Sequence, residues 1–155
     1  MLSPLQLKGH RFTQLHLEGI QKGIPGGDVE VTTTLGVGRH VTEPQEWRVD
    51  LKVEFEPTVG QNGPYRGIAE VVGFFEIIED WPEKDCEALV AINGASLLYG
   101  AIREMILMMS SRSSHGEFLL PTLRFQAPVQ TPAIAVKSPA KKAAKKAIRK
   151  IAKEK

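Results

Sequence analysis

The sequence is poor in the residues that build covalently or metal-stabilised folds. Cys86 is the single cysteine among 155 residues, so an intrachain disulfide and a zinc site of several thiolates within one chain are excluded. No apolar run approaches the roughly 18 residues of a membrane-spanning helix. Residues 1–4 lack the basic and apolar regions of a signal peptide. These absences predict a cytoplasmic protein.

Motifs of nucleotide-binding and catalytic sites are also missing from the sequence. Gly36-Val37-Gly38 is not followed by a third glycine at the spacing of a dinucleotide-binding loop, and no Walker-type lysine follows it. His10 and His16 are predicted on the polar side of one strand, about 20 Å apart, which is too far for one metal ion. Cys86 lies between two acids, which raise rather than lower the pKa of a thiol. We therefore predict a protein that is not an enzyme and uses no cofactor or metal.

The formal net charge of +2 conceals two oppositely charged parts of the chain. Residues 137–155 contain nine Lys or Arg and one acid, a net charge of about +8. Subtracting these from the totals of 20 basic and 18 acidic residues leaves 11 basic and 17 acidic residues in positions 1–136, a net of about −6. The body of the chain is therefore acidic and the C-terminal tail is basic.

Several segments of the acidic body have the apolar alternation of β-strands. The strongest covers residues 47–56, where charged residues alternate with Trp47, Val49, Leu51, Val53 and Phe55. A period of two puts the apolar residues on a buried face and the charges on a wet one, which is typical of an antiparallel sheet. Similar patterns cover residues 29–37, after a Pro-Gly-Gly-Asp turn, and residues 5–17, where Gly9 is a predicted bulge.

A further strand, over residues 69–77, is apolar on both faces. Its predicted inner face consists of Ala69, Val71, Gly73, Phe75 and Ile77. The other face still carries Ile68, Val72 and Phe74. A strand that is apolar on both faces needs cover on both, which a groove or a subunit interface could supply.

A helical period replaces the alternation after Trp81-Pro82. A short helix is predicted up to Ile92, with a break at Asn93-Gly94, and a longer one covers residues 96–109. Four strands followed by helices favour an α+β fold. Residues 127–139 contain three prolines and are interpreted as a linker, and residues 140–155 as a Lys/Ala-rich tail that is disordered or an amphipathic helix.

The longer predicted helix resembles the first long helix of the SecB-type protein-export chaperones. That family shows a small residue, two apolar residues, an aromatic residue and an Ala-Arg-Glu core, and then a Leu-Pro-x-x-x-Phe segment. The matching residues here, with one isoleucine between the Ala and the Arg, are Ala95, Leu97, Leu98, Tyr99, Ala101, Arg103 and Glu104, and then Leu120, Pro121 and Phe125. Upstream, the family's Gly-aromatic-Phe-x-Ile strand is matched by Gly73, Phe74, Phe75 and Ile77. The resemblance covers roughly residues 4–126.

The resemblance implies a SecB-like domain over residues 1–126, with a four-stranded antiparallel sheet followed by helices, assembled as a homotetramer that is a dimer of dimers. Its implied function is that of an ATP-independent chaperone, a holdase, which binds unfolded preproteins and passes them to the motor ATPase of the secretion machinery. Other members hold an antitoxin in toxin–antitoxin systems. Glu70 lies near the place where family members carry motor-contacting acids. Excess apolarity and their place in the resemblance select the client-binding candidates Ile68, Val72, Phe74, Leu98 and Tyr99.

The sequence departs from the family at Gln126-Ala127-Pro128, where members continue into a second helix. The basic tail offers an alternative function as a nucleic-acid or ribosome-binding module, or as an anchor on an anionic membrane. A third alternative is an enzyme whose site is assembled across subunits, and the tail could also be a solubilising extension. The candidate polyanion-binding residues are Lys141, Lys142, Lys145, Lys146, Arg149 and Lys150.

Overall fold

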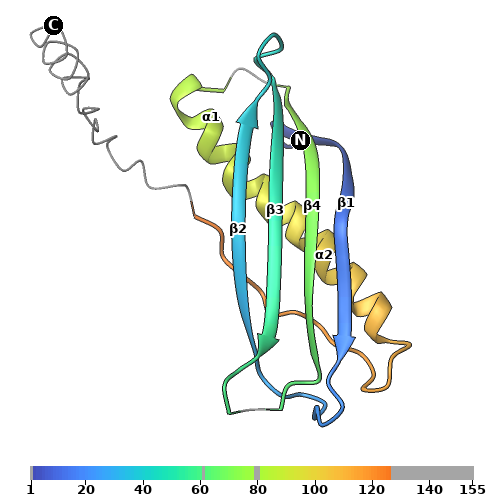
Figure 1. The fold of residues 1–155 in the computed structure, drawn as a ribbon. Helices are drawn as coiled ribbons and strands as arrows, with labels where there is room; N and C mark the ends of the chain where they lie inside the picture. Colours follow the sequence, from blue (N-terminus) through green and yellow to red (C-terminus); the bar gives the residue numbers. More distant parts are fainter. Residues whose placement is uncertain (1, 61, 79–80, 127–155) are drawn as a thin grey trace, which may run out of the picture.

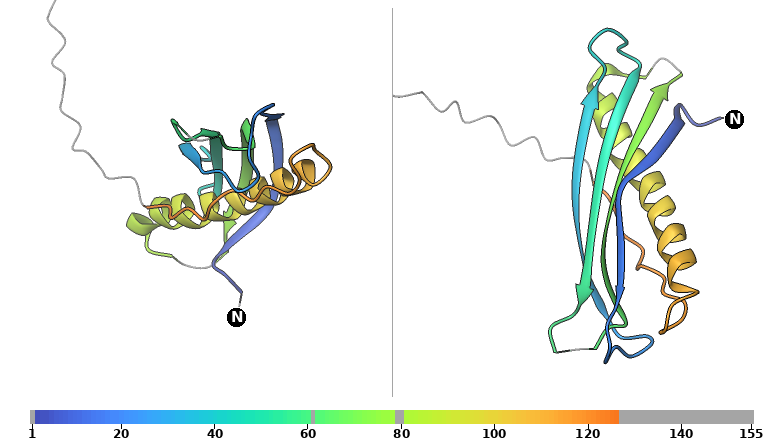
Figure 2. Two further views of the ribbon diagram at one scale, coloured as in Figure 1. Left: turned by 90° about the horizontal axis from the view of Figure 1, so that it is seen from below. Right: turned by 45° about the vertical axis from the view of Figure 1, so that its right-hand side comes forward.

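The chain forms one antiparallel sheet with a long helix on one side (Figure 1). The computed structural model describes residues 2–60, 62–78 and 81–126. The helix crosses the sheet diagonally, so the sheet has a helix-covered inner face and an opposite outer face (Figure 2). Neighbours in the strand order β1-β4-β3-β2 are all antiparallel, and the strands are β1 (Leu5–Gly19), β2 (Val29–Arg39), β3 (Glu46–Pro57) and β4 (Tyr65–Ile77). The predicted α+β class with four antiparallel strands is confirmed.

The inner face is built by the alternation that the sequence predicts for β3 and β4. Along β3 the predicted apolar row is buried in full, from Trp47 to Phe55. On β4 the row beside it is also the predicted one and is buried: Ala69, Val71, Gly73, Phe75 and Ile77. The burial of both rows under the helix fixes the register between β3 and β4, because a slip of either strand by one residue would turn its charged row inward.

β1 is less regular than the other strands. Its pairing with β4 shifts by one residue between Leu7 and Gly9, which confirms the predicted bulge, and again between Phe12 and Gln14. Between the two shifts the alternation is inverted, so that Phe12 opposite Val71 is on the inner face. The prediction that His10 and His16 share the polar face is therefore wrong: His10 lies opposite inner-face Gly73 and His16 opposite outer-face Ile68.

A single helix forms where the sequence predicts two. Gly94 does not end the helix but is buried against the sheet: a Cβ there would lie 3.0 Å from Cγ2 of Val49 and 3.4 Å from the Phe75 ring. A glycine at this position permits a close approach of helix and sheet, which is why the predicted break is absent. The chain passes without interruption through α1 (Glu83–Leu89), the π-helical turn η1 (Val90–Gly94) and α2 (Ala95–Ser110).

The joined helix also corrects the expectation that no segment reaches the length of a membrane span. Glu83–Ser110 has 28 residues and is long and apolar enough to cross a membrane, by length and composition alone. Its most apolar window is 44% buried inside the molecule. Val90, Leu98, Ile102 and Ile106 are fully buried against the sheet, which is the pattern of a core helix in a globular domain.

The last described segment, residues 111–126, turns at residues 111–115 and then runs over the core without forming a helix or a strand. Leu120 is fully buried, its carbonyl oxygen accepts a hydrogen bond of 2.9 Å from Nε of Arg103, and the Tyr65 hydroxyl donates to the carbonyl of Gly116 over 2.8 Å. Phe118, Leu123 and Phe125 pack against the same core, so this segment is part of it. The predicted linker and tail, residues 127–155, lie outside the described residues.

Candidate functional site

The outer face of the sheet carries an apolar row within a charged frame. Along β4, Ile68 is half-buried, Val72 is buried, and Phe74 is 39% exposed. The positions directly opposite these three on the flanking strands are Glu54, Asp50 and Arg48 on β3 and His16, Arg11 and Gly9 on β1. The predicted second apolar face of this strand therefore exists, and no described helix covers it.

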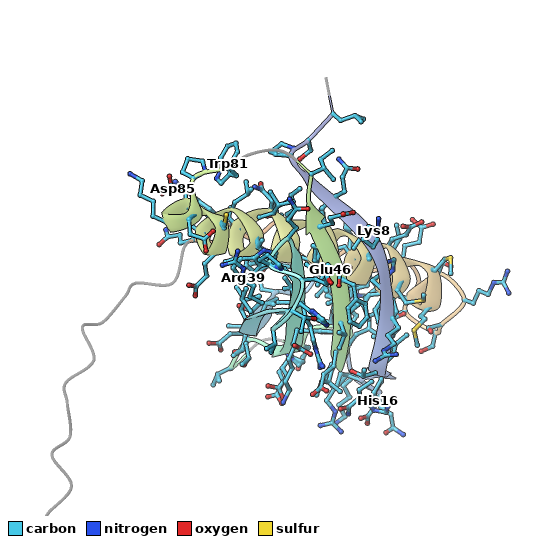
Figure 3. All side chains as sticks on the ribbon, turned by 90° about the horizontal axis from the view of Figure 1, so that it is seen from above. Lys8, His16, Arg39, Glu46, Trp81 and Asp85 are labelled. Carbon is cyan, nitrogen blue, oxygen red and sulfur yellow. The ribbon has the colours of Figure 1, made fainter. Side chains whose placement is uncertain are left out.

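Phe74 borders a trough of about 710 Å³ at the end of the sheet where β2 turns into β3. Residues 38–42, which include the exposed Val41, line the trough together with Arg48 on the neighbouring strand. Lys8 and Glu46 also line it, and Figure 3 looks along the strands onto this end of the sheet. Its walls are mostly apolar, and its volume is within the range of ligand-binding clefts.

One cation lies over the Phe74 ring, and two ion pairs lie near it on the same strands. The guanidinium carbon of Arg11 lies 5.5 Å from the ring centroid. Arg48 forms a forked contact with Asp50, with its shortest N–O distance at 2.6 Å, and the Lys8 amine lies 2.8 Å from Glu76. The hydrogen bond to Glu76 raises the pKa of the Lys8 amine above its usual value. Because these pairs are exposed, they add little stability, but they hold polar side chains beside an exposed aromatic ring.

Two of the five predicted client-binding residues lie elsewhere. Leu98 is fully buried on the side of α2 that faces the sheet. Its Cδ2 atom would lie 2.7 Å from a Cβ built on Gly73 of β4. The Tyr99 hydroxyl donates a hydrogen bond of 2.6 Å to the carbonyl of Pro121, and burial raises the pKa of Tyr99 to about 12. Both side chains hold the helix and the last segment onto the sheet, and the structure does not bring them to the outer face with Ile68, Val72 and Phe74.

The predicted partner-binding residue Glu70 lies on the outer face between Ile68 and Val72. One of its carboxylate oxygens is 4.0 Å from the Lys52 amine. Its role in partner binding stays a prediction. The six predicted polyanion-binding residues of the tail lie outside the described residues.

The sequence does not predict the trough, although the Gly36-Val37-Gly38 spacing is one of its features. Gly36 and Gly38 alternate onto the outer face, opposite Asp50 and Arg48, and a Cβ on Gly38 would meet nothing within 4 Å. The Gly-x-Gly spacing therefore opens the surface of the sheet, rather than forming a phosphate-binding loop. The strand order that brings Gly38 into line with Phe74 could not be deduced from the sequence.

A second hollow lies between β1 and the start of α2. Its volume is about 550 Å³, and Leu5, Leu7 and Leu97 are among its lining residues. Leu97 is 48% exposed on the side of α2 that does not face the sheet, and Met108 further along the helix is 60% exposed. The helix therefore carries apolar side chains beyond those that it packs against the sheet.

The described residues contain little that points to catalysis. Burial raises the pKa of the Cys86 thiol, and the nearby Glu83 carboxylate raises it further, so the thiol is protonated and weakly nucleophilic at neutral pH. Within residues 2–60, 62–78 and 81–126, no three His, Cys, Asp or Glu side chains are grouped as a metal site would require.

Comparison with known proteins supports the fold. No family model matches the sequence, and no curated protein matches it. Among solved structures, the chain is similar to a SecB-like chaperone of Mycobacterium tuberculosis in complex with a ChAD peptide from the HigA1 antitoxin, with a TM-score of 0.58 and 15% identity, over 77% of this chain and 90% of that one. A protein of unknown function from Streptococcus agalactiae has a TM-score of 0.37 and 14% identity, over 76% and 97% of the two chains, which is too distant to support an argument. The chain therefore has a SecB-like fold.

Proposed function

We propose that this protein is an ATP-independent chaperone that binds unfolded polypeptides. The observation that carries the proposal is the exposed Phe74 ring, which continues the outer-face apolar row of Ile68 and Val72 and borders a mostly apolar trough, with charged residues of β1 and β3 beside the row. Exposed contiguous apolar surface with a polar surround is typical of a surface that binds other proteins. The SecB-like fold supports the proposal, because the similar structure is a chaperone that holds an antitoxin peptide.

Binding without nucleotide fits the sequence, which has no Gly-rich phosphate-binding fingerprint and no Walker-type lysine. A holdase needs no chemical step, because apolar burial on an accessible surface keeps the client from aggregating. We propose unfolded preproteins destined for the secretion machinery as the main clients, handed on through the surface around Glu70. Service to an antitoxin is the second candidate role, which the peptide bound to the similar chaperone favours.

The homotetramer is part of the same proposal. The side of α2 away from the sheet exposes Leu97 and Met108, and the hollow between β1 and α2 adds Leu7, so this side suits a subunit contact. Four subunits of 17.1 kDa would give 4 × 17.1 = 68.4 kDa. Light scattering should give this mass, and Leu97→Glu should lower it. A monomer at micromolar concentration would contradict the assembly without touching client binding.

The tail supports a separate candidate function in polyanion binding. Its net charge of about +8 contrasts with about −6 for the body, and lysine–phosphate contacts weaken steeply with salt because they release counterions. Truncation after Ala135 should abolish binding to ribosomes and anionic vesicles and leave chaperone activity intact. Unchanged binding after truncation would dispose of both tail functions.

The test of the main proposal is aggregation of a chemically unfolded client without nucleotide. The full chain should suppress light scattering near one tetramer per client in moderate salt. Phe74→Ser should weaken the suppression. Val59→Ser is the control and should not weaken it, because Val59 is even more exposed but lies in the β3–β4 turn and not on the outer-face row. No suppression by the wild type, or suppression lost with the tail, would overturn the proposal in favour of polyanion binding.

A further inference from the structure

The two edges of the sheet differ in how they are protected from pairing. β1 is broken by two bulges and carries Lys8, Arg11 and Glu18 along its length. β2 pairs with β3 over eleven successive residues with no shift in register, contains no proline, and has charged residues only at Glu30 and Arg39 near its ends. Natural sheets protect free edges with bulges, charges and prolines, so the β2 edge is unusually open to another strand.

The hydrogen-bond register shows which backbone groups of β2 are free. The Thr58 amide donates to the Asp28 carbonyl, and the His40 amide donates to the Glu46 carbonyl. At both ends of the β2–β3 ladder, the hydrogen bonds between the two strands therefore join even-numbered residues. In an antiparallel ladder, residues that hydrogen-bond to the neighbouring strand alternate with residues whose N–H and C=O groups point away from it. The odd-numbered residues Val31, Thr33 and Leu35, followed by Val37, therefore turn their N–H and C=O groups outward from the sheet. No backbone hydrogen bond among the described residues outside the ladder reaches them.

We infer that the β2 edge binds an extended segment of an unfolded client as a fifth strand. The inference rests on the proposed chaperone function and adds the mode of binding to it. Main-chain hydrogen bonds would give affinity that does not depend on the client's side chains, as in other cases of strand addition. A chaperone with varied clients requires such tolerance.

The side chains beside the edge suit a partner of variable sequence. On the inner face, Val31, Leu35 and Val37 are only half-buried, so apolar side chains of an added strand can complete their cover. On the outer face the corresponding β2 residues are small, with Thr32 and Thr34 followed by Gly36 and Gly38. Small neighbours leave room for client side chains of any size. A unique partner would instead be matched by a shaped pocket.

The edge also leads directly into the trough. Gly38 is the last small outer-face residue of β2 and lines the trough with residues 39–42. A client strand paired along β2 therefore reaches the trough at one end, where an apolar side chain can enter beside Phe74. Backbone pairing and side-chain burial would then act on one continuous segment, which fits an unfolded chain better than a second folded copy of this acidic body.

Amide hydrogen exchange by NMR tests this mode of binding, with the full chain and permanently unfolded, carboxymethylated α-lactalbumin as the client. In the free protein, the amides of Val31, Thr33, Leu35 and Val37 should exchange fast and those of the even-numbered β2 residues slowly. Saturating client should slow the odd-numbered amides about ten-fold or more and leave the even-numbered ones unchanged.

A substitution at Thr33 supplies the matched functional test. Thr33→Pro removes an outward donor without touching the β3 ladder and should weaken client affinity about two- to ten-fold, the effect of one hydrogen bond. Thr33→Ala keeps the donor and should bind like wild type, and equal melting temperatures would show that both variants fold.

Three outcomes would overturn the inference. Client binding with the odd-numbered amides still exchanging fast would remove the fifth strand and leave the chaperone proposal standing, whereas an absence of client binding would remove both. Protection already present in the free protein would assign the edge to another occupant. Loss of that protection on truncation after Gln126 would identify the chain's own C-terminal segment, and a dependence on protein concentration would identify a second copy.

Discussion

The two faces of strand β4 are both apolar, yet only one of them is covered by the helix. The inner row, with Val71, Gly73 and Phe75, lies under α2 and is closed by Leu98. The outer row of Ile68, Val72 and Phe74 lies between charged strands and opens into the trough. The inner face therefore accounts for stability, and the outer face carries apolar surface that folding leaves unused.

This difference has a direct consequence for mutations. A change on the inner face should alter the free energy of unfolding and should affect function only through stability. A change on the outer face should alter client binding at nearly constant stability. The first two predictions test the two halves of this separation with the largest effects, and the next two test smaller electrostatic differences between the faces.

Leu98→Ala should produce the largest loss of stability. Leu98 is fully buried between helix and sheet, so its truncation leaves a cavity and should lower the free energy of unfolding by about 2–5 kcal/mol. Urea unfolding followed by circular dichroism measures this. A loss below about 1 kcal/mol would show that α2 is not packed on the sheet and would return Leu98 to the client-binding candidates.

Gly38→Tyr should alter binding and spare stability. A side chain at Gly38 meets nothing within 4 Å and extends over the trough, so it should compete with clients and reduce their affinity about ten-fold. Replacing a strand glycine by tyrosine favours the strand, so the midpoint of urea unfolding should stay equal or rise slightly. Glu56→Tyr, on the same outer face but at the end of β3 far from the trough, is the control. Unchanged client affinity in Gly38→Tyr would rule out the trough as a client site.

The phenol of Tyr99 should make the inner face sensitive to alkaline pH. Burial raises its pKa from 10 to about 12, so the unfolded chain loses this proton before the folded one does. The stability linked to the neutral phenol is complete below pH 10 and is lost as the pH rises through 12. The melting temperature of wild type should therefore fall more steeply between pH 10 and 12 than that of Tyr99→Phe. Parallel curves would contradict a buried phenol.

The outer-face ion pair between Arg66 and Glu18 should give the smallest effect. The hydrogen bond from Arg66 lowers the pKa of the Glu18 carboxyl below its usual 4.5. The linked stability is present above pH 4.5 and disappears as the pH falls through the lower folded-state value. Arg66→Gln should melt slightly below wild type at pH 7 and equal to it near pH 2. Both residues are exposed, so a large difference at pH 7 would contradict the assignment of stability to the inner face.

Much of the fold could be predicted from the sequence because one wet face forces strict alternation. The inner rows of β3 and β4 follow from a period of two in their apolar residues. The bulge near Gly9 follows from a glycine inside an otherwise alternating strand pattern. The second shift near Gln14 could not be predicted, since two bulges restore the alternation at the strand's far end. The helix break at Asn93-Gly94 was wrong because glycine serves there for close packing on Val49, a contact between distant parts of the chain.

The candidate site could be predicted only where it lies on one strand. Excess apolar residues at Ile68, Val72 and Phe74 indicate an uncovered face, because alternation assigns each to a side. Leu98 and Tyr99 could not be separated from these, since their burial depends on which side of α2 meets the sheet. The trough depends on the β2–β3 turn and on β3 lying between β2 and β4, and no local pattern specifies that order.

The most direct test of the division between the faces is methyl NMR of the full chain during titration with unfolded client. Client binding should shift or broaden the methyl signals of outer-face Ile68 and Val72. The methyl signals of Ile102 and Ile106, which are fully buried on the sheet-facing side of α2, should stay unchanged. Shifts confined to Ile102 and Ile106, with Ile68 and Val72 unmoved, would show that clients enter between helix and sheet, and would contradict the assignment of function to the outer face.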